Sequence, residues 1–351
     1  MTARLSVVVL AFGPEPWLNR TVTAALASTG VQVEVVVVDN GCTSGAVAAV
    51  ADRPGVRVHT PGVNLGYAAG CQYGAATTDT PYLAFVNSDA ELATDALAAL
   101  VAVAAEPGVG LATASVRLAD SPDLINSAGN PLHVAGLSWA GGHGEPAADF
   151  GDRRQVPAGS GCCFVMRRAV WRAMGGLTEE YFLYHEDTEL SLRLWQRGLT
   201  VEYVPDAVVL HHYEFSRNPT KSYLLERNRL LMVATTYQAR TLALLAPVLL
   251  LTEAAMVTTA VTGGWLRPKL RGWGWLWRHR RWILTRRRQL QAERTVPDSG
   301  VARLMTARFD PSNVEAPAGV GAYNAVVAAW WALVRPLLPA RLPARPPSGP
   351  A

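Results

Sequence analysis

The chain has 351 residues, of which 50% are hydrophobic and 17% are charged, and its formal net charge is +4. This length is typical of about two structural units, and the apolar fraction is sufficient for a full core. The mild charge argues against a dedicated nucleic-acid-binding protein, which usually presents a strongly basic face. The cysteines form no CxxC pair, so we expect free thiols rather than a disulfide or zinc set.

Short apolar runs alternate with helix-compatible segments in the first part of the chain, at residues 5–10, 33–38, 56–59 and 82–86. Their hydrophobicity is continuous, which is typical of strands covered on both faces, and the alternation with helices predicts a mostly parallel sheet. Thr94 is the predicted N-cap of a following helix. The first run is too short for a secretory signal, so we expect the N-terminal domain to stay in the cytoplasm.

The middle of the chain is less regular. Residues 120–157 are rich in Gly, Pro and Asp and predict a long loop. A strand over 159–166 and a helix over 186–196, stopped by Gly198, are expected next. Two short strands at 201–204 and 207–210 then lead to His211 and His212.

The composition changes near residue 230. Residues 241–262 contain a single charge, Glu253, and have the length of a spanning helix. Trp and Arg crowd the next stretch, as at a membrane interface. Because Glu253 is costly if it faces lipid, a spanning helix and a peripheral or re-entrant hairpin both stay open. We therefore expect a first, α/β domain at 1–230, membrane-associating helices at 231–300, and a tail at 301–351 with an apolar helix and a disordered Pro-rich end.

Two carboxylates follow predicted strands, Asp39 after residues 33–38 and Asp89 after residues 82–86. Ligands of parallel sheets bind outside the carboxyl ends of the strands, so these side chains are candidates for one site. The first strand is followed by AFGPEP and not by GxGxxG, and the chain contains no GxxxxGK[ST]. These absences argue against a nicotinamide dehydrogenase and a P-loop enzyme.

Five segments, in this order, resemble the family-2 glycosyltransferases of the GT-A fold: SVVVLAFG, VVVVDNGCTSG, NLGYAAGCQYG, AFVNSDAEL and SGCCFVMRRAVWRAMGGLTEEYFLYHEDTELSLRLWQRG. The resemblance covers residues 5–229. The later string LHHYEFSRNPTKSYLLERNRL is similar to a membrane-associated bacterial branch with rhamnosyltransferase-like and galactofuranosyltransferase-like enzymes. Together these resemblances imply an α/β fold with a Rossmann-like, mostly parallel sheet flanked by helices, followed by a hydrophobic and basic helical region.

The resemblance also implies a nucleotide site. Asp39 would accept hydrogen bonds from the base or ribose, which suits a carboxylate at a strand end, although Asp-Asn-Gly is also an ordinary turn. Gly66 would allow close backbone approach. The nucleotide-binding residues implied are Asp39, Asn40, Asn64, Gly66, Asn87 and Ser88.

Asn87-Ser88-Asp89 occupies the position of the family's DxD motif, which holds a divalent cation, Mn²⁺ or Mg²⁺, against the diphosphate. Asn87 replaces the first Asp, so Asp89 is the one strong oxygen ligand; the alternative is an acidic helix cap. In galactofuranosyltransferase-like relatives a His at the place of His211 completes the metal site, and imidazole suits Mn²⁺ better than Mg²⁺. His212 is the competing candidate.

By the same resemblance, Asp187 is the base that takes a proton from the acceptor hydroxyl, and Glu186 orients the acceptor, with inversion at the anomeric carbon. The alternative is that both acids only favour the positive end of a helix dipole. Trp139 and His143 are expected in the acceptor pocket. Four basic residues would contact a diphosphate or lie on a solvated helix: Arg217, Lys221, Arg227 and Arg229.

The implied activity is transfer from dTDP-rhamnose, UDP-galactofuranose or another UDP-hexose to a hydroxyl of a lipid-linked glycan. The implied place is the cytoplasmic face of the cell membrane, in cell-envelope polysaccharide synthesis. Partners are the nucleotide-sugar donor, a glycan or polyprenyl-diphosphate-linked acceptor and the lipid surface, without nucleic acid; the sequence does not indicate an oligomeric state. The alternative is an inactive GT-A scaffold, against which the joint presence of Asp89, Asp187 and His211 argues.

Overall fold

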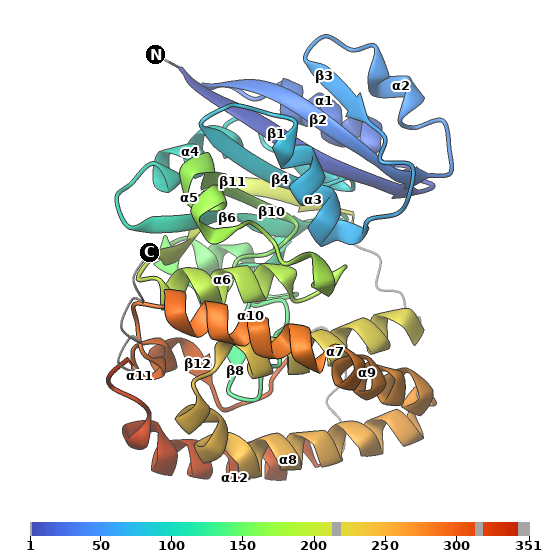
Figure 1. Cartoon of the computed structure of the whole chain (residues 1–351). Helices are drawn as coiled ribbons and strands as arrows, with labels where there is room; N and C mark the ends of the chain where they lie inside the picture. The colour runs from blue at the N-terminus through green and yellow to red at the C-terminus, as the bar shows by residue number, and fades with distance from the viewer. Residues whose placement is uncertain (1, 213–218, 313–318, 343–351) are drawn as a thin grey trace, which may run out of the picture.

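The computed structural model of the chain describes residues 2–212, 219–312 and 319–342. Its centre is a ten-stranded sheet with the main strand order β3-β2-β1-β4-β10-β6-β11-β5 (Figure 1). The first half is parallel and consists of β1 (Ala3–Gly13), β2 (Val31–Cys42), β3 (Val56–His59) and β4 (Tyr82–Asn87).

The second half of the sheet mixes directions. β10 is antiparallel to β4 and β6, and β5 is antiparallel to β11, whereas β6 and β11 are parallel. Two short strands, β7 and β9, pair with β6 and β11, and a separate pair joins β8 to β12 near the C-terminus. These strands are β5 (Ala90–Leu92), β6 (Val109–Leu118), β7 (Ser121–Ser127), β8 (Leu132–His133), β9 (Arg154–Gln155), β10 (Cys163–Arg167), β11 (Thr200–His211) and β12 (Met305–Thr306).

Both faces of the sheet are covered, as the continuous apolar runs predict. Along β1, Val7 and Val9 belong to one buried cluster, and Val8 and Leu10 belong to the other. Because successive side chains of a strand point to opposite faces of the sheet, β1 contributes residues to both cores. One face is covered by α1 (Leu18–Leu26), α2 (Ala48–Ala51) and α4 (Ala96–Ala104), and the other by α3 (Gly66–Ala76), α5 (Arg168–Met174) and α6 (Glu186–Gln196).

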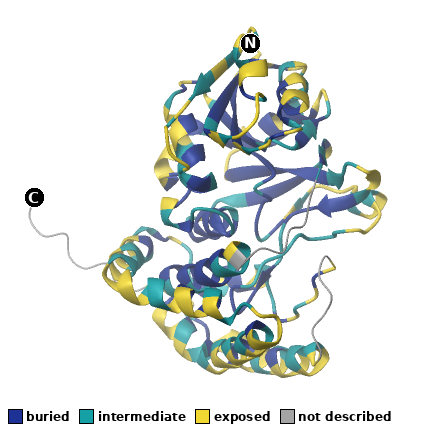
Figure 2. Cartoon of the chain, turned by 90° about the vertical axis from the view of Figure 1, so that its right-hand side faces the viewer, coloured by how far each residue is buried: buried dark blue, intermediate teal, exposed yellow. Residues whose placement is uncertain are grey.

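The C-terminal third adds helical layers beyond α6. Figure 1 shows α10 and α7 below α6, with α9 beside α7, and α8 with α12 as the lowest layer. Figure 2 shows buried strands at the centre of the molecule and exposed residues along the outer helices. These helices are α7 (Pro219–Thr236), α8 (Ala239–Thr262), α9 (Leu266–Arg278), α10 (Arg280–Glu293), α11 (Asp298–Val301) and α12 (Val320–Val334).

Four buried or half-buried charges connect α7, α8 and α9. The Lys269 ammonium donates to Glu226 at 2.6 Å and to Glu253 at 3.1 Å. Arg229 donates to the same two carboxylates. Burial alone would raise the pKa of Glu226, but Arg229 and Lys269 outweigh it and lower that pKa to about 2. Glu253 thus faces protein, so the expected cost of its exposure to lipid does not arise.

The fold confirms the predicted α/β class with a mostly parallel sheet flanked by helices, and three local predictions are wrong. Thr94 is not an N-cap: α4 begins at Ala96, and the Thr94 carbonyl accepts from the Thr29 N–H. Residues 120–157 contain β7, β8 and β9 instead of one long loop. The two strands expected at 201–210 are one strand, β11, whose register shifts between Val204 and Val208.

The predicted domain boundaries do not coincide with the ends of helices or strands. Residue 230 lies inside α7, which runs without a break to Thr236. The tail is tied to the N-terminal unit, because β12 pairs with β8. The expected disordered end falls largely on residues 343–351, outside the described residues.

Candidate active site

Asp39 and Asn87 lie at one edge of the sheet, on the two strands that flank β1. Ala11 pairs with Asp39 on one side, and Leu10 pairs with Asn87 on the other. The register therefore brings the ends of β2 and β4 together at the carboxyl edge, where parallel sheets bind ligands.

The Asp39 carboxylate closes the turn that follows it. Its Oδ1 accepts from the N–H groups of Gly41 at 3.3 Å and Cys42 at 2.9 Å. This is the Asx-type turn that Asp-Asn-Gly favours. The second oxygen takes no part in these bonds, so the carboxylate keeps acceptor capacity for a ligand.

The buried Asn40 amide holds the loop before α3. Its Nδ2 donates to Asn64 Oδ1 at 3.1 Å and to the Gly66 carbonyl at 3.3 Å. Its Oδ1 accepts from the Leu65 N–H at 2.8 Å. Asn64 in turn accepts from the Gly66 N–H at 2.8 Å. Asn40 and Asn64 therefore stabilise the loop that lies beside the sheet edge.

Gly66 brings this loop against the segment that precedes Asp187. Its φ is +75°, and a Cβ there would lie 2.4 Å from the Phe182 ring. The Ala68 N–H also donates to the Phe182 carbonyl at 3.1 Å. A side chain at Gly66 would therefore separate the two segments as well as strain the backbone.

Asp89 and His211 meet at the end of β11. The distance from His211 Nε2 to Asp89 Oδ1 is 3.1 Å, and His211 Nδ1 lies 3.1 Å from Asn126 Oδ1. Because the Asn126 oxygen can only accept, it favours a proton on Nδ1 and directs Nε2 toward Asp89. This is the orientation that a carbonyl partner gives to metal-binding histidines.

The Asp89–His211 pair fits a divalent cation. Neighbouring ligands on an octahedral ion with bonds of about 2.1 Å are separated by about 3.0 Å, close to the observed spacing. No group of three His, Cys, Asp or Glu side chains that could hold a metal occurs within the described ranges. The protein can thus contribute two ligands here, and other coordination has to come from ligand oxygens or water.

His212 is engaged elsewhere. Its Nε2 contacts Glu91 Oε1 at 2.5 Å, and its ring stacks on Trp17 with centroids 3.6 Å apart. Of the two candidate histidines, the geometry pairs His211 with Asp89 and turns His212 toward a different carboxylate.

Sequence reasoning missed Glu15, which lies beside the DxD-like segment. Its Oε1 accepts from the Phe12 N–H at 2.6 Å, and its φ is 49°. Burial raises the pKa of Glu15; hydrogen bonds from Phe12 and Ser88 act in the opposite direction, and Asp89 raises it further. The signal in the sequence is an acid between two prolines directly after a strand.

Asp187 is the second residue of α6, and its carboxylate is held by three hydrogen bonds. Its Oδ2 accepts from the Gly161 N–H at 2.9 Å, and its Oδ1 accepts from the Thr188 N–H at 2.6 Å and from Thr188 Oγ1 at 3.1 Å. Burial raises the pKa of Asp187, and these hydrogen bonds partly offset the increase. The side chain is half-buried, so it is fixed in place without being sealed from a substrate.

Glu186 points into the protein, in contrast to its neighbour. Its Oε2 is buried without a hydrogen-bond partner among the described residues. Burial raises the pKa of Glu186 well above its ordinary value, and Asp187 raises it further. Burial raises the pKa values of the neighbouring Tyr67 and Cys71, and Glu186 raises both further. Tyr67 donates to the Gly161 carbonyl at 2.6 Å. Glu186 thus lies under the site, on the side of α3.

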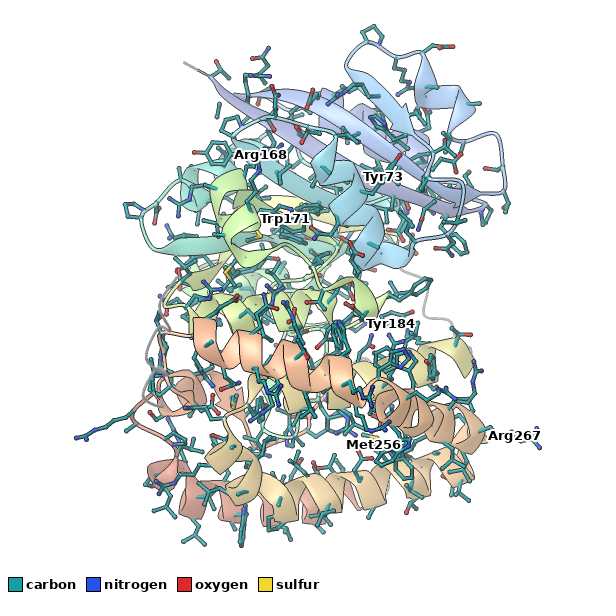
Figure 3. The ribbon with its side chains drawn as sticks, viewed as in Figure 1. Tyr73, Arg168, Trp171, Tyr184, Met256 and Arg267 are labelled. Atoms are coloured by element: carbon teal, nitrogen blue, oxygen red, sulfur yellow. The ribbon has the colours of Figure 1, made fainter. Side chains whose placement is uncertain are left out.

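The segment before α6 is strained. Phe182, Tyr184 and His185 have φ values of 63°, 69° and 65°, in the left-handed region that non-glycine residues rarely adopt. Such a conformation costs of order 1–3 kcal/mol per residue and persists only when its surroundings enforce it. Tyr184 projects from this segment above α7 and α9 (Figure 3).

Asn228 of α7 enforces that conformation. Its Nδ2 lies within hydrogen-bond distance of three carbonyls, those of Tyr181 and Leu183 at 2.9 Å and of Tyr184 at 2.6 Å. Arg227 adds bonds to the carbonyls of Glu180 and Tyr181. Two neighbouring residues of α7 thereby clamp the loop that delivers Glu186 and Asp187.

The expectations for the basic residues need correction. Arg227 and Arg229 are neither solvated nor turned to a ligand, because both are buried and hydrogen-bonded within the protein. Lys221 lies over the Tyr184 ring, 5.6 Å from its centroid. Arg217 lies outside the described residues.

The segment at 120–157 reaches the site through several side chains. Asn126 supports His211, and His143 Nδ1 lies 3.3 Å from the Asn126 carbonyl. Ser138 Oγ lies 3.4 Å from Thr188 Oγ1, beside Asp187. Trp139 makes an edge contact with Phe309 of the C-terminal tail. The structure therefore brings this segment to both Asp89 and Asp187.

Comparison with known proteins matches this architecture. The sequence model of Glycosyl transferase family 2 fits residues 6–175. An N-acetylglucosaminyl-diphospho-decaprenol L-rhamnosyltransferase from Mycobacterium tuberculosis is 31% identical over 238 residues, which are 60% of this chain and 77% of the relative.

Solved structures share the fold at low identity. A mannosyltransferase from Pyrobaculum calidifontis, in complex with GDP-Man and Mn²⁺, has a TM-score of 0.51 at 18% identity and covers 83% of this chain and 85% of its own. GalNAc-T7 with UDP, GalNAc and Mn²⁺ has a TM-score of 0.54 at 18% identity and covers 67% of this chain, which spans 48% of that protein. The chain belongs to the family-2 glycosyltransferases and is a glycosyltransferase with a GT-A fold.

Replacing Asn228 with Asp tests the clamp. The change keeps the size but puts a carboxylate oxygen against three carbonyls, so the loop should shift and Asp187 with it. We expect kcat to fall about a hundredfold while nucleotide affinity changes little. Steady-state kinetics with nucleotide titration measure both. The matched change Asn19→Asp, on the surface of α1, should leave kcat unaltered; an unaltered kcat in Asn228→Asp would refute the clamp.

His185 predicts a pH dependence of stability. Burial, aided by Arg229, lowers the pKa of His185 to about 4 from 6.5. The unfolded chain therefore takes up this proton first, and stability falls as the pH drops from 6.5 toward 4. The variant His185→Asn removes this group, and asparagine tolerates positive φ. Urea unfolding at several pH values should show that the decrease in the free energy of unfolding between pH 6.5 and 4 is smaller in the variant, by up to roughly 3 kcal/mol. Parallel pH profiles for both proteins would contradict this role.

Proposed function

We propose that the chain transfers a sugar from a nucleoside-diphosphate sugar to a hydroxyl of a polyprenyl-diphosphate-linked glycan, with inversion. The observation that carries the proposal is Asp187, a half-buried carboxylate fixed by the Gly161 N–H beside the sheet edge that carries Asp89 and His211. The Mycobacterium tuberculosis relative supports a rhamnosyl donor such as dTDP-rhamnose and a lipid-linked acceptor. UDP-galactofuranose or another UDP-hexose is the alternative donor.

In this proposal the nucleotide lies along the carboxyl edge of β1, β2 and β4. Asp39 accepts from the base or ribose through the oxygen that its turn leaves available. The loop of Asn64 to Gly66 lies against the nucleotide, and Asn87 and Ser88 lie near the diphosphate. Asp89 and His211 would hold a divalent cation, Mn²⁺ or Mg²⁺, whose charge neutralises the diphosphate.

Asp187 acts as the base. Its Oδ2 accepts one hydrogen bond, from Gly161, so a lone pair is available for the acceptor hydroxyl. As the hydroxyl oxygen bonds to the anomeric carbon, its proton passes to Asp187, and the bond from that carbon to the diphosphate breaks. A pKa raised by burial makes Asp187 a stronger base than an exposed aspartate. Attack opposite the departing diphosphate inverts the anomeric centre.

A scaffold without activity is the second candidate. The structural neighbours were solved with Mn²⁺ and UDP or GDP-Man, which supports nucleotide binding but does not separate a transferase from a scaffold. The strained loop before Asp187 supports catalysis, because backbone strain of this kind clusters at functional sites such as active sites.

The variant Asp187→Asn separates these candidates. It keeps the hydrogen-bond geometry on one oxygen and removes the base, so kcat should fall by about 10²–10⁴-fold. Donor dissociation constants from calorimetry with Mn²⁺ should change little. Turnover of dTDP-rhamnose with a short-chain polyprenyl-diphosphate acceptor is the assay, and Asp79→Asn, on the exposed surface, is the control. An unchanged rate in Asp187→Asn would remove the base assignment; nucleotide binding without any wild-type turnover would favour the scaffold.

A further inference from the structure

Helices α8 and α12 form the outermost layer of the molecule and pack side by side (Figure 1). Trp330 Nε1 of α12 donates to the Leu244 carbonyl of α8 at 2.9 Å. Thr252 Oγ1 and the Tyr323 hydroxyl are hydrogen-bonded at 2.8 Å. A shallow apolar groove runs between the two helices. Their relative position is therefore fixed by specific contacts, so they present one continuous outer surface.

That outer surface, which we name the docking face, is aliphatic. Leu250 is 71% exposed and Val261 59% on α8, and Leu333 is 64% exposed and Val326 55% on α12. Large aliphatic side chains exposed together on packed helices mark an interaction surface.

The other side of α8 is polar and is covered by protein at the middle of the helix. Glu253 binds Arg229 of α7 and Lys269 of α9, and it accepts from Trp273 Nε1 at 3.1 Å. Arg229 and Lys269 are almost wholly buried by this packing. α8 has the length and composition of a membrane span. If it crossed a bilayer in this structure, α7 and α9 would lie at the depth of the hydrocarbon with it, and their charged side chains oppose that arrangement.

The charge next to the docking face is positive. The sequences of α8, α9 and α12 contain one acidic residue, Glu253, and it is paired. α9, which packs against α8, exposes Arg267, Arg271 and Trp273. Arg267 projects outward beside α8 (Figure 3). Tryptophan and arginine around an aliphatic surface match the interface of an anionic bilayer.

We propose that the docking face binds an anionic lipid bilayer, with α8 and α12 lying in the plane of the interface and neither helix spanning. Their exposed aliphatic side chains enter the acyl boundary, and the exposed arginines of α9 contact the headgroups.

The candidate active site then stands above the membrane. Tyr184 and Arg267 lie on the same side of the molecule, with α7 and α9 between the site and the docking face (Figure 3). An acceptor whose lipid is in the bilayer would reach Asp187 past these helices. This last step rests on the proposed function, whereas the contact with the bilayer does not.

Vesicle flotation with the full chain tests the docking face. The vesicles are phosphatidylcholine with and without phosphatidylglycerol. We expect the wild type to float with the anionic vesicles and to be released by alkaline carbonate. The double variant Leu250→Glu with Leu333→Glu should lose at least about tenfold in partition coefficient, because it places charges in the acyl boundary. The control Tyr73→Glu adds a charge at a half-exposed aromatic of α3, far from the docking face (Figure 3), and should float as the wild type does.

Circular dichroism melts of the variants establish that they are folded. Three results would overturn the proposal: wild type that does not float, wild type that resists carbonate as a spanning helix does, or a folded double variant that floats as well as wild type. If the docking face instead joins two copies of the chain, sedimentation will show a dimer that the double variant abolishes, without vesicle binding.

Turnover of a water-soluble acceptor separates this proposal from the proposed function. The double variant should match the wild type in that assay, since its changes are remote from Asp187. Absence of turnover in the wild type would count against the proposed function and would leave the flotation result standing.

Discussion

Two consecutive backbone groups connect the two halves of the candidate site. The Gly161 N–H donates to Asp187 Oδ2, and the Cys162 carbonyl accepts from the Asn87 N–H, each at 2.9 Å. The segment that leads into β10 therefore sets the position of α6 relative to the end of β4. A Cβ at Gly161 would lie 3.3 Å from the Asp187 carboxylate, which leaves little room for a side chain. The end of β4 and the carboxylate of Asp187 are thus placed by one turn of main chain, and rigid placement is what the proposed transfer reaction requires.

The C-terminal helices complete this arrangement. Asn228 and Arg227 hold the left-handed segment before α6, and the neighbouring Arg229 anchors α7 to α8 and α9 through Glu253 and Glu226. The buried charges are paired with one another, so their attraction offsets part of their desolvation cost. One helix, α7, therefore connects the strained loop of the site with the layer that carries the docking face. This linkage explains why residue 230 does not separate two independent units.

Much of the sheet could be predicted from the sequence, because buried parallel strands are continuous apolar runs and the residues after them mark the site edge. The helix α6 has the predicted bounds, since an acidic first turn marks its start and Gly198 follows its end. The sequence predicted two strands in place of β11 because Pro205 and Asp206 are typical of a turn. In the structure these residues lie at a register shift in the pairing of β11 with β6. Asn126 and Asn228 could not be found, because a hydrogen bond between residues distant in sequence has no local pattern. The choice between His211 and His212 was likewise decided only by the register of β11 with β5, which turns one ring to Asp89.

In the proposed function, Asp89 and His211 hold the cation of the donor while Asp187 faces the acceptor. Anomalous diffraction at the manganese edge, from crystals grown with Mn²⁺ and a nucleoside diphosphate, tests it most directly. The account predicts one strong peak within about 2.3 Å of both Asp89 Oδ1 and His211 Nε2, next to the phosphates. A peak held by His212 and Glu91, or a nucleotide bound at the sheet edge with no peak beside it, would contradict the account.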